Sequence, residues 1–261
     1  MTDKTFKAIL ISIGVVFATC LVVVILVFSS GSGKDSATSN DKSKSTSIAS
    51  QYKPRADYAD QLSPSSPVWN QSMLIGDSTS KNHFIEYTDM FCPYCAKFNL
   101  ALHSSQADFE QNYIQPKKMN LEIRLVSMLT DHENSDKGGA YTYCAAKENK
   151  FQEYYSAMIQ KVNEQYFAKG IGAYHGAPDI PILPDSFFED EYAKAGLDKQ
   201  KMTECMQKGE GLNDLGVATA TASRKLPNGL PHFVFNTFTT SGFDDGGYSR
   251  IKTMFKAGGV S

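Results

Sequence analysis

The chain has 261 residues, with 26 Lys and Arg against 28 Asp and Glu, which gives a net charge of −2. This length fits one domain of medium size with appendages. The near-neutral charge gives no support to a nucleic-acid partner, because proteins of that class carry a clustered excess of basic residues.

The first element in chain order is an apolar segment. Residues 8–28 contain no charged side chain and are numerous enough to span a bilayer as a helix. No cleavage site of small residues follows, so we expect an uncleaved transmembrane signal anchor after a short tail, 1–7, rather than a removed signal peptide. Lysines flank the segment on both sides, so positive charges do not orient it.

A polar stretch separates this segment from the rest of the chain. Residues 29–51 are mostly Ser, Gly, Lys, Asp, Thr and Asn, and 52–67 contain three prolines. Such a composition has almost nothing to bury. We therefore expect a flexible linker over 29–67 and a folded domain over 68–261.

The domain is organised around the stretch Phe84–Phe98, whose sequence is FIEYTDMFCPYCAKF. Its β-branched and aromatic start predicts a buried strand over 84–88, and Pro93 suits the first position of a helix. Cys92 then lies at the helix N-terminus, where free N–H groups and the macrodipole favour a thiolate. Cys95 lies one turn further, within disulfide reach. We expect Cys92 to be the exposed nucleophile and Cys95 the buried resolving thiol.

A Cys-x-x-Cys pair also occurs in zinc sites, which is the alternative interpretation of this motif. Zinc would require a second pair of ligands at close spacing. The five histidines are isolated from one another, at His83, His103, His132, His175 and His232. We therefore expect redox chemistry, with no metal and no other cofactor.

Glu86, in the predicted strand, is a candidate for proton transfer. Phe84, Glu86 and Thr88 share one face of the strand, and a central strand covered on both sides would bury Glu86. Burial raises the pKa of a carboxyl group, so Glu86 could pass a proton to or from Cys95. The alternative is that Glu86 points to a solvated edge of the sheet.

Helices and strands continue along the chain in a mixed order. A short strand or edge is expected before the central strand, and irregular chain is expected where Gly and Pro are frequent. The expected elements are a strand at 73–76, a helix from Cys95 to Tyr113 with a possible kink, a strand at 121–128, a helix at 139–165, irregular chain at 168–185, a helix at 186–195 ended by Gly196, a helix capped by Asp198, a helix at 212–224, a hairpin at 233–241, and a helix at 248–257 ended by Gly258 and Gly259.

Two separated motifs carry a resemblance to a known family. The segment FIEYTDMFCPYC at 84–95, followed after a helical region by GLPHFVFN at 229–236, resembles the DsbA family of thioredoxin-fold thiol–disulfide oxidoreductases. The resemblance runs from about Val68 to the C-terminus. It implies an α/β thioredoxin-like fold with a helical insertion at about 130–225.

The resemblance also implies roles for particular residues. It implies a redox disulfide Cys92–Cys95, an acid at the position of Glu86, and a cis proline at Pro231 facing the cysteines. In the family, Leu230 and Pro231 would offer backbone hydrogen bonds to a substrate strand, a mode of recognition that tolerates many sequences. Pro93 and Tyr94, between the cysteines, would lie beside the bound substrate.

The activity implied is disulfide formation in exported proteins that carry free thiols. A membrane partner, DsbB-like or VKOR-like, would reoxidise the pair, and the catalytic domain of a single-pass membrane protein would lie on the extracytoplasmic side, where disulfides persist. Strongly oxidising members carry Pro-His between the cysteines. The Pro93-Tyr94 pair leaves a disulfide reductase or isomerase open, and a non-catalytic thioredoxin-like binding module is the third possibility.

Two further cysteines remain in the domain, Cys144 and Cys205. Cys20 falls in the apolar segment, and lone thiols in an exported protein risk mispairing, so we expect a structural Cys144–Cys205 disulfide. Some relatives that resemble this chain carry a cysteine pair in corresponding helices. The alternative is two separate buried thiols that act as small hydrophobic side chains.

Overall fold

The computed structural model describes residues 73–104, 106–129, 133–223, 226, 229–236, 238–244 and 247–260. The predicted tail, membrane segment and linker all lie outside these residues. Among the helices of the described part, none has both the length and the apolar character needed to cross a membrane.

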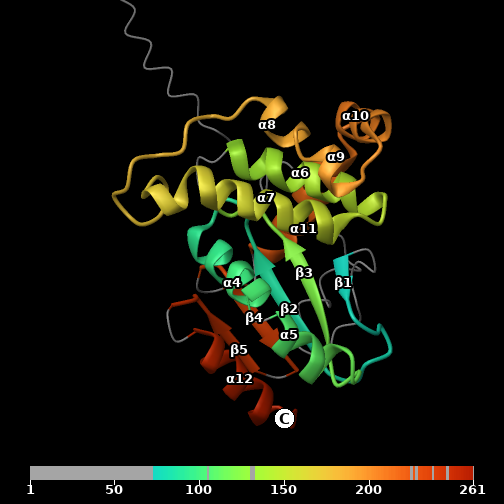
Figure 1. Cartoon of the computed structure of the whole chain (residues 1–261), viewed down its shortest axis with the longest axis vertical. Coiled ribbons are helices and arrows are strands. Elements are labelled where there is room, and N and C mark those ends of the chain that lie inside the picture. Colours follow the sequence, from blue (N-terminus) through green and yellow to red (C-terminus); the bar gives the residue numbers. More distant parts are fainter. Residues whose placement is uncertain are drawn as a thin grey trace, which may run out of the picture. The chain divides into compact units, whose positions relative to one another are not determined.

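A mixed sheet forms the centre of the domain (Figure 1). Its order is β1-β3-β2-β4-β5, so β2 is the central strand, as the sequence predicted. β2 pairs in parallel with β3 and antiparallel with β4, while β1 and β5 add antiparallel edges. The strands span Leu74–Ile75 (β1), His83–Thr88 (β2), Asn120–Leu125 (β3), His232–Phe235 (β4) and Phe238–Ser241 (β5).

Helices surround the sheet and extend beyond one end of it. In Figure 1 helices α6 to α10 gather beyond the upper ends of β2 and β3, while α12 and the C-terminus lie at the other end, near β5. The helices span Pro93–Ser104 (α4), Gln106–Phe109 (α5), Glu110–Ile114 (η3, a π-helix), Glu133–Lys147 (α6), Phe151–Gln165 (α7), Phe167–Lys169 (η4, a 3₁₀-helix), Asp185–Glu189 (α8), Tyr192–Ala195 (α9), Lys199–Gln207 (α10), Glu210–Ala222 (α11) and Gly247–Ala257 (α12).

Alternating residues of β2 reach two different cores. The Phe84 ring lies 5.8 Å from that of Phe233 in β4 and 4.9 Å from that of Phe255 in α12, within a large core that also includes α4, α6 and α7. Ile85 and Tyr87 point to the opposite face and a smaller apolar cluster. Because both faces are covered, every residue of β2 is buried, which confirms the prediction that Glu86 lies inside the domain.

The predicted single helix over 139–165 is wrong. The structure has two helices here, α6 and α7, which form a hairpin around Asn149. Asn149 has a φ of 56°, and the amide of Lys150 donates back to the carbonyl of Ala145 at 3.0 Å. Asn accepts this left-handed conformation more readily than most residues, so the chain reverses at a residue that carries no proline or glycine signal.

Other boundaries agree with the sequence or differ by a few residues. The predicted helix at 186–195 is divided into α8 and α9, and it ends as expected at Gly196, with a φ of 69°. Asp198 caps α10, since its carboxylate accepts from the amides of Gln200 and Lys201. β3 ends at Leu125 rather than Met128, and the helix after Cys95 breaks into α4, α5 and η3.

Candidate active site

The Cys92–Cys95 pair lies where β2 gives way to α4. Both side chains are free thiols. The amide of Cys92 donates to the carbonyl of Asp89 at 3.1 Å, and the Cys92 carbonyl accepts from the amide of Ala96 at 3.0 Å. Cys92 is thus the residue that precedes the first turn of α4, with Pro93 at the first helical position. At that place the free N–H groups of the helix favour an anion.

The prediction that Cys92 is exposed is wrong. Its side chain is buried, with 3% of the residue exposed. The turn before β4 covers it, and the thiol donates to the carbonyl oxygen of Leu230 at 3.7 Å. Sequence alone places Cys92 at a helix end but does not show what lies over that end.

The turn that covers Cys92 has the expected backbone. The Leu230–Pro231 peptide bond is cis, as the resemblance implied. Tyr87 of β2 pairs with His232 of β4, and this pairing brings the buried Pro231 and the half-buried Leu230 to the end of β2 that carries the cysteines. Tyr94, between the cysteines, is 44% exposed, the largest exposure in this group.

Cys95 and Glu86 occupy the inner side of the site, and neither is exposed. Burial is the main reason that the pKa of the Cys95 thiol lies well above its ordinary value, and the neighbouring Cys92 and the charge of Glu86 raise it further. Burial also raises the pKa of Glu86 to about 8, although hydrogen bonds from Thr88 and Asn99 favour its carboxylate. Both groups are therefore mostly neutral near pH 7.

Asn99 and Tyr155 complete this inner side, and neither was predicted from the sequence to belong to the site. The Asn99 amide nitrogen lies 3.0 Å from Glu86 Oε1 and 3.1 Å from Tyr155 Oη. Tyr155 Oη lies 3.1 Å from Thr88 Oγ1. Asn99 follows Cys95 by one helical turn, a spacing that could have suggested it. Tyr155 comes from α7, and nothing in the sequence marks it among the neighbouring tyrosines.

A pocket with mostly apolar walls opens between α4 and α7, and Asn99 and Tyr155 are part of its lining, together with Leu102, Phe109 and Phe151. Glu86 does not line this pocket. The two polar side chains therefore stand between the pocket and the carboxyl group.

A second buried carboxylate shows by contrast what is special about Glu86. Glu122 Oε2 lies 2.9 Å from His83 Nε2 and 2.8 Å from Arg124 Nη2. Burial alone would raise the pKa of Glu122, but hydrogen bonds from His83 and Arg124 and the Arg124 charge hold it below its ordinary value. Glu86 is bonded by neutral donors instead, so its carboxyl group keeps the proton to a much higher pH.

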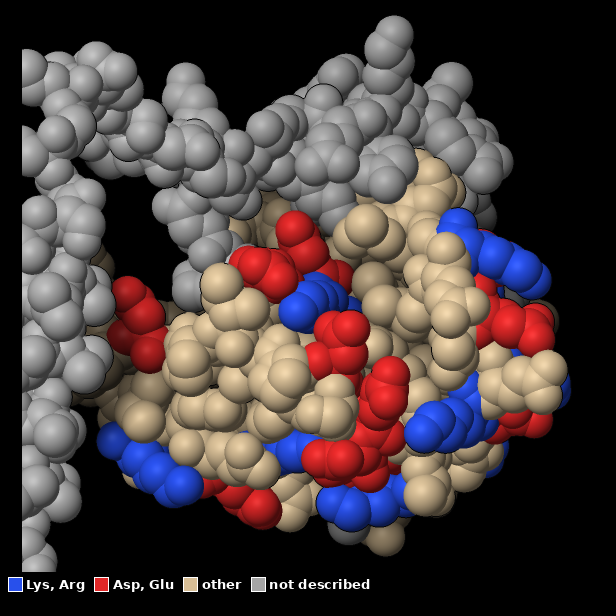
Figure 2. Space-filling view, turned by 90° about the horizontal axis from the view of Figure 1, so that it is seen from above, with Lys and Arg blue, Asp and Glu red and all other residues tan. Residues whose placement is uncertain are grey.

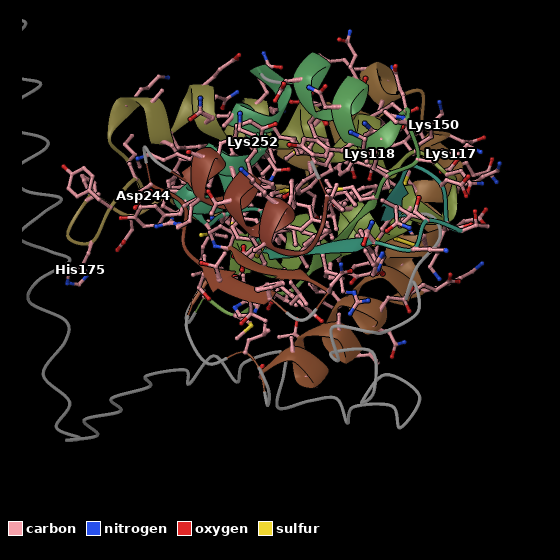
Figure 3. All side chains as sticks on the ribbon, turned by 90° about the horizontal axis from the view of Figure 1, so that it is seen from below. Lys117, Lys118, Lys150, His175, Asp244 and Lys252 are labelled. Atoms are coloured by element: carbon pink, nitrogen blue, oxygen red, sulfur yellow. A yellow bond between two sulfur atoms is a disulfide. The ribbon has the colours of Figure 1, made fainter. Side chains whose placement is uncertain are left out.

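The described histidines lie apart from one another in the fold. His232 is buried, and its Nδ1 lies 2.6 Å from Ser241 Oγ on β5, so it packs within the strand pair. Burial lowers the pKa of His232. His175 lies at the outer end of the loop that precedes α8 (Figure 3). Within the described ranges, no group of three His, Cys, Asp or Glu side chains could hold a metal ion.

Cys144 and Cys205 form a disulfide, in agreement with the pairing expected from the sequence. Their Cα atoms are 5.9 Å apart, and the bond joins α6 to α10 across 61 positions of sequence. Both cysteines are buried, and the Cys144 sulfur also contacts the Met206 sulfur at 3.7 Å. The cross-link lies wholly within the helical insertion.

Charges of both signs are interspersed over the helical end of the domain (Figure 2). Many of them are paired, such as Lys147 with Glu210 and Asp214, and Lys161 with Glu191. A field of one sign that would attract a polyanion is not visible on this face.

These features define a thioredoxin-like α/β domain with a Cys-x-x-Cys pair at a helix N-terminus. The family model described as thioredoxin matches residues 69–239, and the chain belongs to this family. No curated protein matches the chain.

Solved structures share the fold at low sequence identity. α-DsbA1 from Wolbachia pipientis is 15% identical, with a TM-score of 0.54, covering 71% of this chain and 89% of that one. Oxidised BdbD from Bacillus subtilis is 14% identical, with a TM-score of 0.56, over 71% and 91%. MdbA, a thiol–disulfide oxidoreductase from Corynebacterium diphtheriae, is 15% identical, with a TM-score of 0.52, over 76% and 99%.

Proposed function

We propose that this chain is a thiol–disulfide oxidoreductase that forms disulfides in exported proteins through Cys92 and Cys95. The observation that carries the proposal is the pair of free thiols at the N-terminus of α4, one under the Leu230–Pro231 turn and the other beside a buried carboxyl group. The fold shared with MdbA, described as a thiol–disulfide oxidoreductase, supports it.

The reaction begins with the oxidised Cys92–Cys95 disulfide. A substrate thiolate attacks Cys92 Sγ, and the bond between the two enzyme sulfurs breaks. This step gives a mixed disulfide at Cys92 and releases the Cys95 thiolate. A second thiolate of the substrate then attacks the substrate sulfur of the mixed disulfide. The substrate loses two electrons as its disulfide forms, and the Cys92 thiolate leaves beside the N–H groups of α4.

Glu86 supplies or takes the proton that Cys95 needs. A thiolate at Cys95 would be fully buried, which is unfavourable in an apolar environment. Because Glu86 has its pKa raised to about 8, it holds a proton at neutral pH that it can give to Cys95 as the enzyme is reduced. The reverse transfer accompanies reoxidation, when Cys95 must lose its proton to attack Cys92.

The turn at Leu230 and Pro231 is the proposed substrate contact. The Leu230 carbonyl faces Cys92, and the exposed Tyr94 ring lies close to Cys92 in sequence. An extended segment of a substrate would bind to backbone groups of this turn, with Pro93 and Tyr94 beside it. Recognition through backbone groups would admit many substrate sequences.

Residues 8–28 would anchor the domain to the membrane, with the linker 29–67 as a tether on the extracytoplasmic side. A DsbB-like or VKOR-like membrane partner would accept the two electrons from the reduced pair. Protease digestion of intact and opened cells tests this arrangement. The arrangement would be contradicted if the domain resisted the protease although the protease could reach the outer face of the membrane.

The direct test of the function uses trapped intermediates. With a reduced, unfolded substrate and glutathione disulfide, the wild-type chain should accelerate disulfide formation. Cys95→Ser should accumulate a substrate disulfide at Cys92, and Cys92→Ser should form none. Absence of both acceleration and trapping would favour a non-catalytic binding module.

The reduction potential of the pair decides between an oxidase and the alternative reductase or isomerase. Equilibration of Cys92–Cys95 with glutathione buffers measures it. An oxidase requires a potential above that of the glutathione pool in its compartment. A potential near that of cytosolic reductants would turn the proposal towards a reductase that uses the same residues.

A further inference from the structure

Asn99 has too few hydrogens for the oxygen atoms around it. Its amide nitrogen lies 3.0 Å from Glu86 Oε1, 3.0 Å from the Cys95 carbonyl oxygen and 3.1 Å from Tyr155 Oη. A side-chain amide carries two hydrogens, so three acceptors compete for two donors. A hydrogen given to Tyr155 is withdrawn from Glu86 or from the backbone of Cys95.

Tyr155 also contacts Thr88 at the end of β2. Its Oη lies 3.1 Å from Thr88 Oγ1, and either hydroxyl can donate in this pair. Because the Asn99 nitrogen can only donate to Tyr155, the phenol hydrogen is available for Thr88. Tyr155 is buried, and its ring stacks on that of Phe151 with centroids 5.5 Å apart. The phenol is thus held in place by α7, and its oxygen shares the Asn99 donor with the carboxyl group.

From this geometry we infer that Asn99 and Tyr155 are positioning residues that set the ionisation of Glu86 in opposite directions. The inference rests on the proposed function, in which Glu86 serves Cys95. Asn99 stabilises the carboxylate by donating to it, whereas Tyr155 competes for a hydrogen of Asn99 and favours the neutral acid. Through Tyr155 the helical insertion takes part in the chemistry of a site that otherwise belongs to β2 and α4.

The groups that face Glu86 can be named for each neighbouring element of the described domain. α4 presents Cys95 and Asn99, and α7 presents Tyr155. The end of β2 presents Thr88 and, next to it, the carboxyl group of Asp89, whose charge acts on Tyr155. The strand neighbours opposite Glu86 are Ile123 in β3 and Phe233 in β4, which do not titrate.

The test is the titration of Glu86 itself in the full chain. Glutamate labelled with ¹³C at the side-chain carboxyl gives a resonance that follows ionisation, and its loss in Glu86→Gln assigns it. Asn99→Leu removes a donor at similar volume and should move the Glu86 titration up by about one pH unit, a tenfold change in the ratio of the two forms. Tyr155→Phe removes the competing oxygen and should move it down.

Tyr154→Phe is the matched control. Tyr154 is the preceding residue on α7, equally buried, and its hydroxyl donates to the carbonyl of Phe188 at 3.1 Å. Its loss removes a buried hydrogen bond without touching Glu86, so the titration should stay where it is in the wild type. Shifts of Asn99→Leu and Tyr155→Phe in the same direction, or no shift in either, would overturn the inference. If Asn99→Leu does not fold, Tyr155→Phe decides alone.

A second readout links the titration to the reaction. The pH midpoint for release of Cys92 from a mixed disulfide by Cys95 should move in the same direction as the Glu86 resonance in each variant, whereas a merely loosened structure would change rates at all pH values alike. If the wild type exchanges no disulfides, the proposed function fails while the titration still tests the inference. If exchange is normal but Glu86 titrates at the same pH in the wild type and in both variants, only the inference fails.

Discussion

At the scale of single residues, the two cysteines of the pair should react very differently. Cys95 is fully buried, and its thiol has a pKa well above the ordinary value, whereas Cys92 adjoins the free N–H groups of α4. Only the thiolate reacts with alkylating reagents. In the reduced wild type at pH 7, we expect iodoacetamide to label Cys92 at least about ten times faster than Cys95. Mass spectrometry of timed samples measures both rates.

The variant Cys92→Ala is the control for this experiment. It leaves Cys95 as the only free thiol among the described cysteines, and that thiol should remain unlabelled while the protein is folded. Labelling of both cysteines at similar rates in the wild type would show that Cys95 is not the inner thiol.

Glu86 should make the stability of the fold depend on pH. Its pKa is raised by burial from 4.5 to about 8, so the folded protein holds a proton that the unfolded chain releases between these values. The contribution of Glu86 to stability is therefore greatest below about pH 4.5 and falls as the pH rises towards 8, by up to about 1.4 kcal/mol for each pH unit. Glu86→Gln stays neutral, so its advantage over the wild type should grow across this window. Urea unfolding at pH 4, 6 and 8 measures it.

Glu164→Gln serves as the control for that series. Glu164 is an exposed residue of α7 that accepts a hydrogen bond from Gln160, and its replacement should leave the pH dependence as in the wild type. A stability difference between Glu86→Gln and the wild type that is the same at all three pH values would contradict a buried neutral acid.

The residues nearest the chemistry could be found from the sequence, while their supporting contacts could not. The strand pattern of 84–88 and the spacing of Cys92 and Cys95 are local signals, and each depends on only a few neighbouring residues. Tyr155 reaches Thr88 across 67 positions of sequence. A contact of that kind is set by how α7 packs on the sheet, which periodicity along one helix does not encode.

At the scale of elements, the contact between α6 and α11 depends on Gly211. A methyl group at this position would overlap the carbonyl oxygen of Ala140 and come within 2.8 Å of Cys144 Sγ. The first obstacle is backbone, so the two helices would have to separate. Gly211→Ala should therefore lower the free energy of unfolding by about 1–3 kcal/mol, although alanine is the better helix former. Urea unfolding at fixed pH tests this.

Asn213→Ala on the same helix separates packing from helix propensity. Asn213 is exposed, so its replacement should leave stability unchanged or raise it slightly. A Gly211→Ala variant as stable as Asn213→Ala would mean that α11 can move away from α6 at no cost.

Element boundaries were predictable where a residue type forces them. Gly196 ends α9 with a positive φ, and Asp198 caps α10 with its side chain, and both signals are visible in the sequence. The break between α6 and α7 was missed because Asn149 is a weaker signal, and apolar residues suited to a helix continue on both sides of it. The hairpin forms because α6 and α7 pack on each other and α7 packs on α4, which is tertiary information.

At the scale of the whole domain, one apolar core joins the sheet to the helical insertion. Phe84 and Phe233 from the strands belong to the same buried cluster as Tyr141 of α6 and Phe188 of α8. The insertion is thus packed as part of the domain, and a change in its stability should shift the midpoint of the global unfolding transition. The Cys144–Cys205 disulfide is the covalent link that tests this, because it lies within the insertion and away from the Cys92–Cys95 pair in sequence.

Removal of that disulfide should destabilise the domain without abolishing the exchange chemistry. The bond closes a loop of 61 positions, and restricting such a loop in the unfolded chain stabilises the fold by roughly 4 kcal/mol in the chain-entropy model. The double variant Cys144→Ala, Cys205→Ala should therefore unfold at a lower urea concentration, with a melting temperature lower by about 10 °C. Differential scanning calorimetry measures the shift, and the rate of mixed-disulfide formation at Cys92 at 25 °C is the control that should stay unchanged. A double variant with the wild-type melting temperature would show that α6 and α10 are already held together in the unfolded chain.

A single unfolding transition for both the sheet and the insertion is expected because they share one core, whereas two separated transitions would mean that the insertion unfolds on its own.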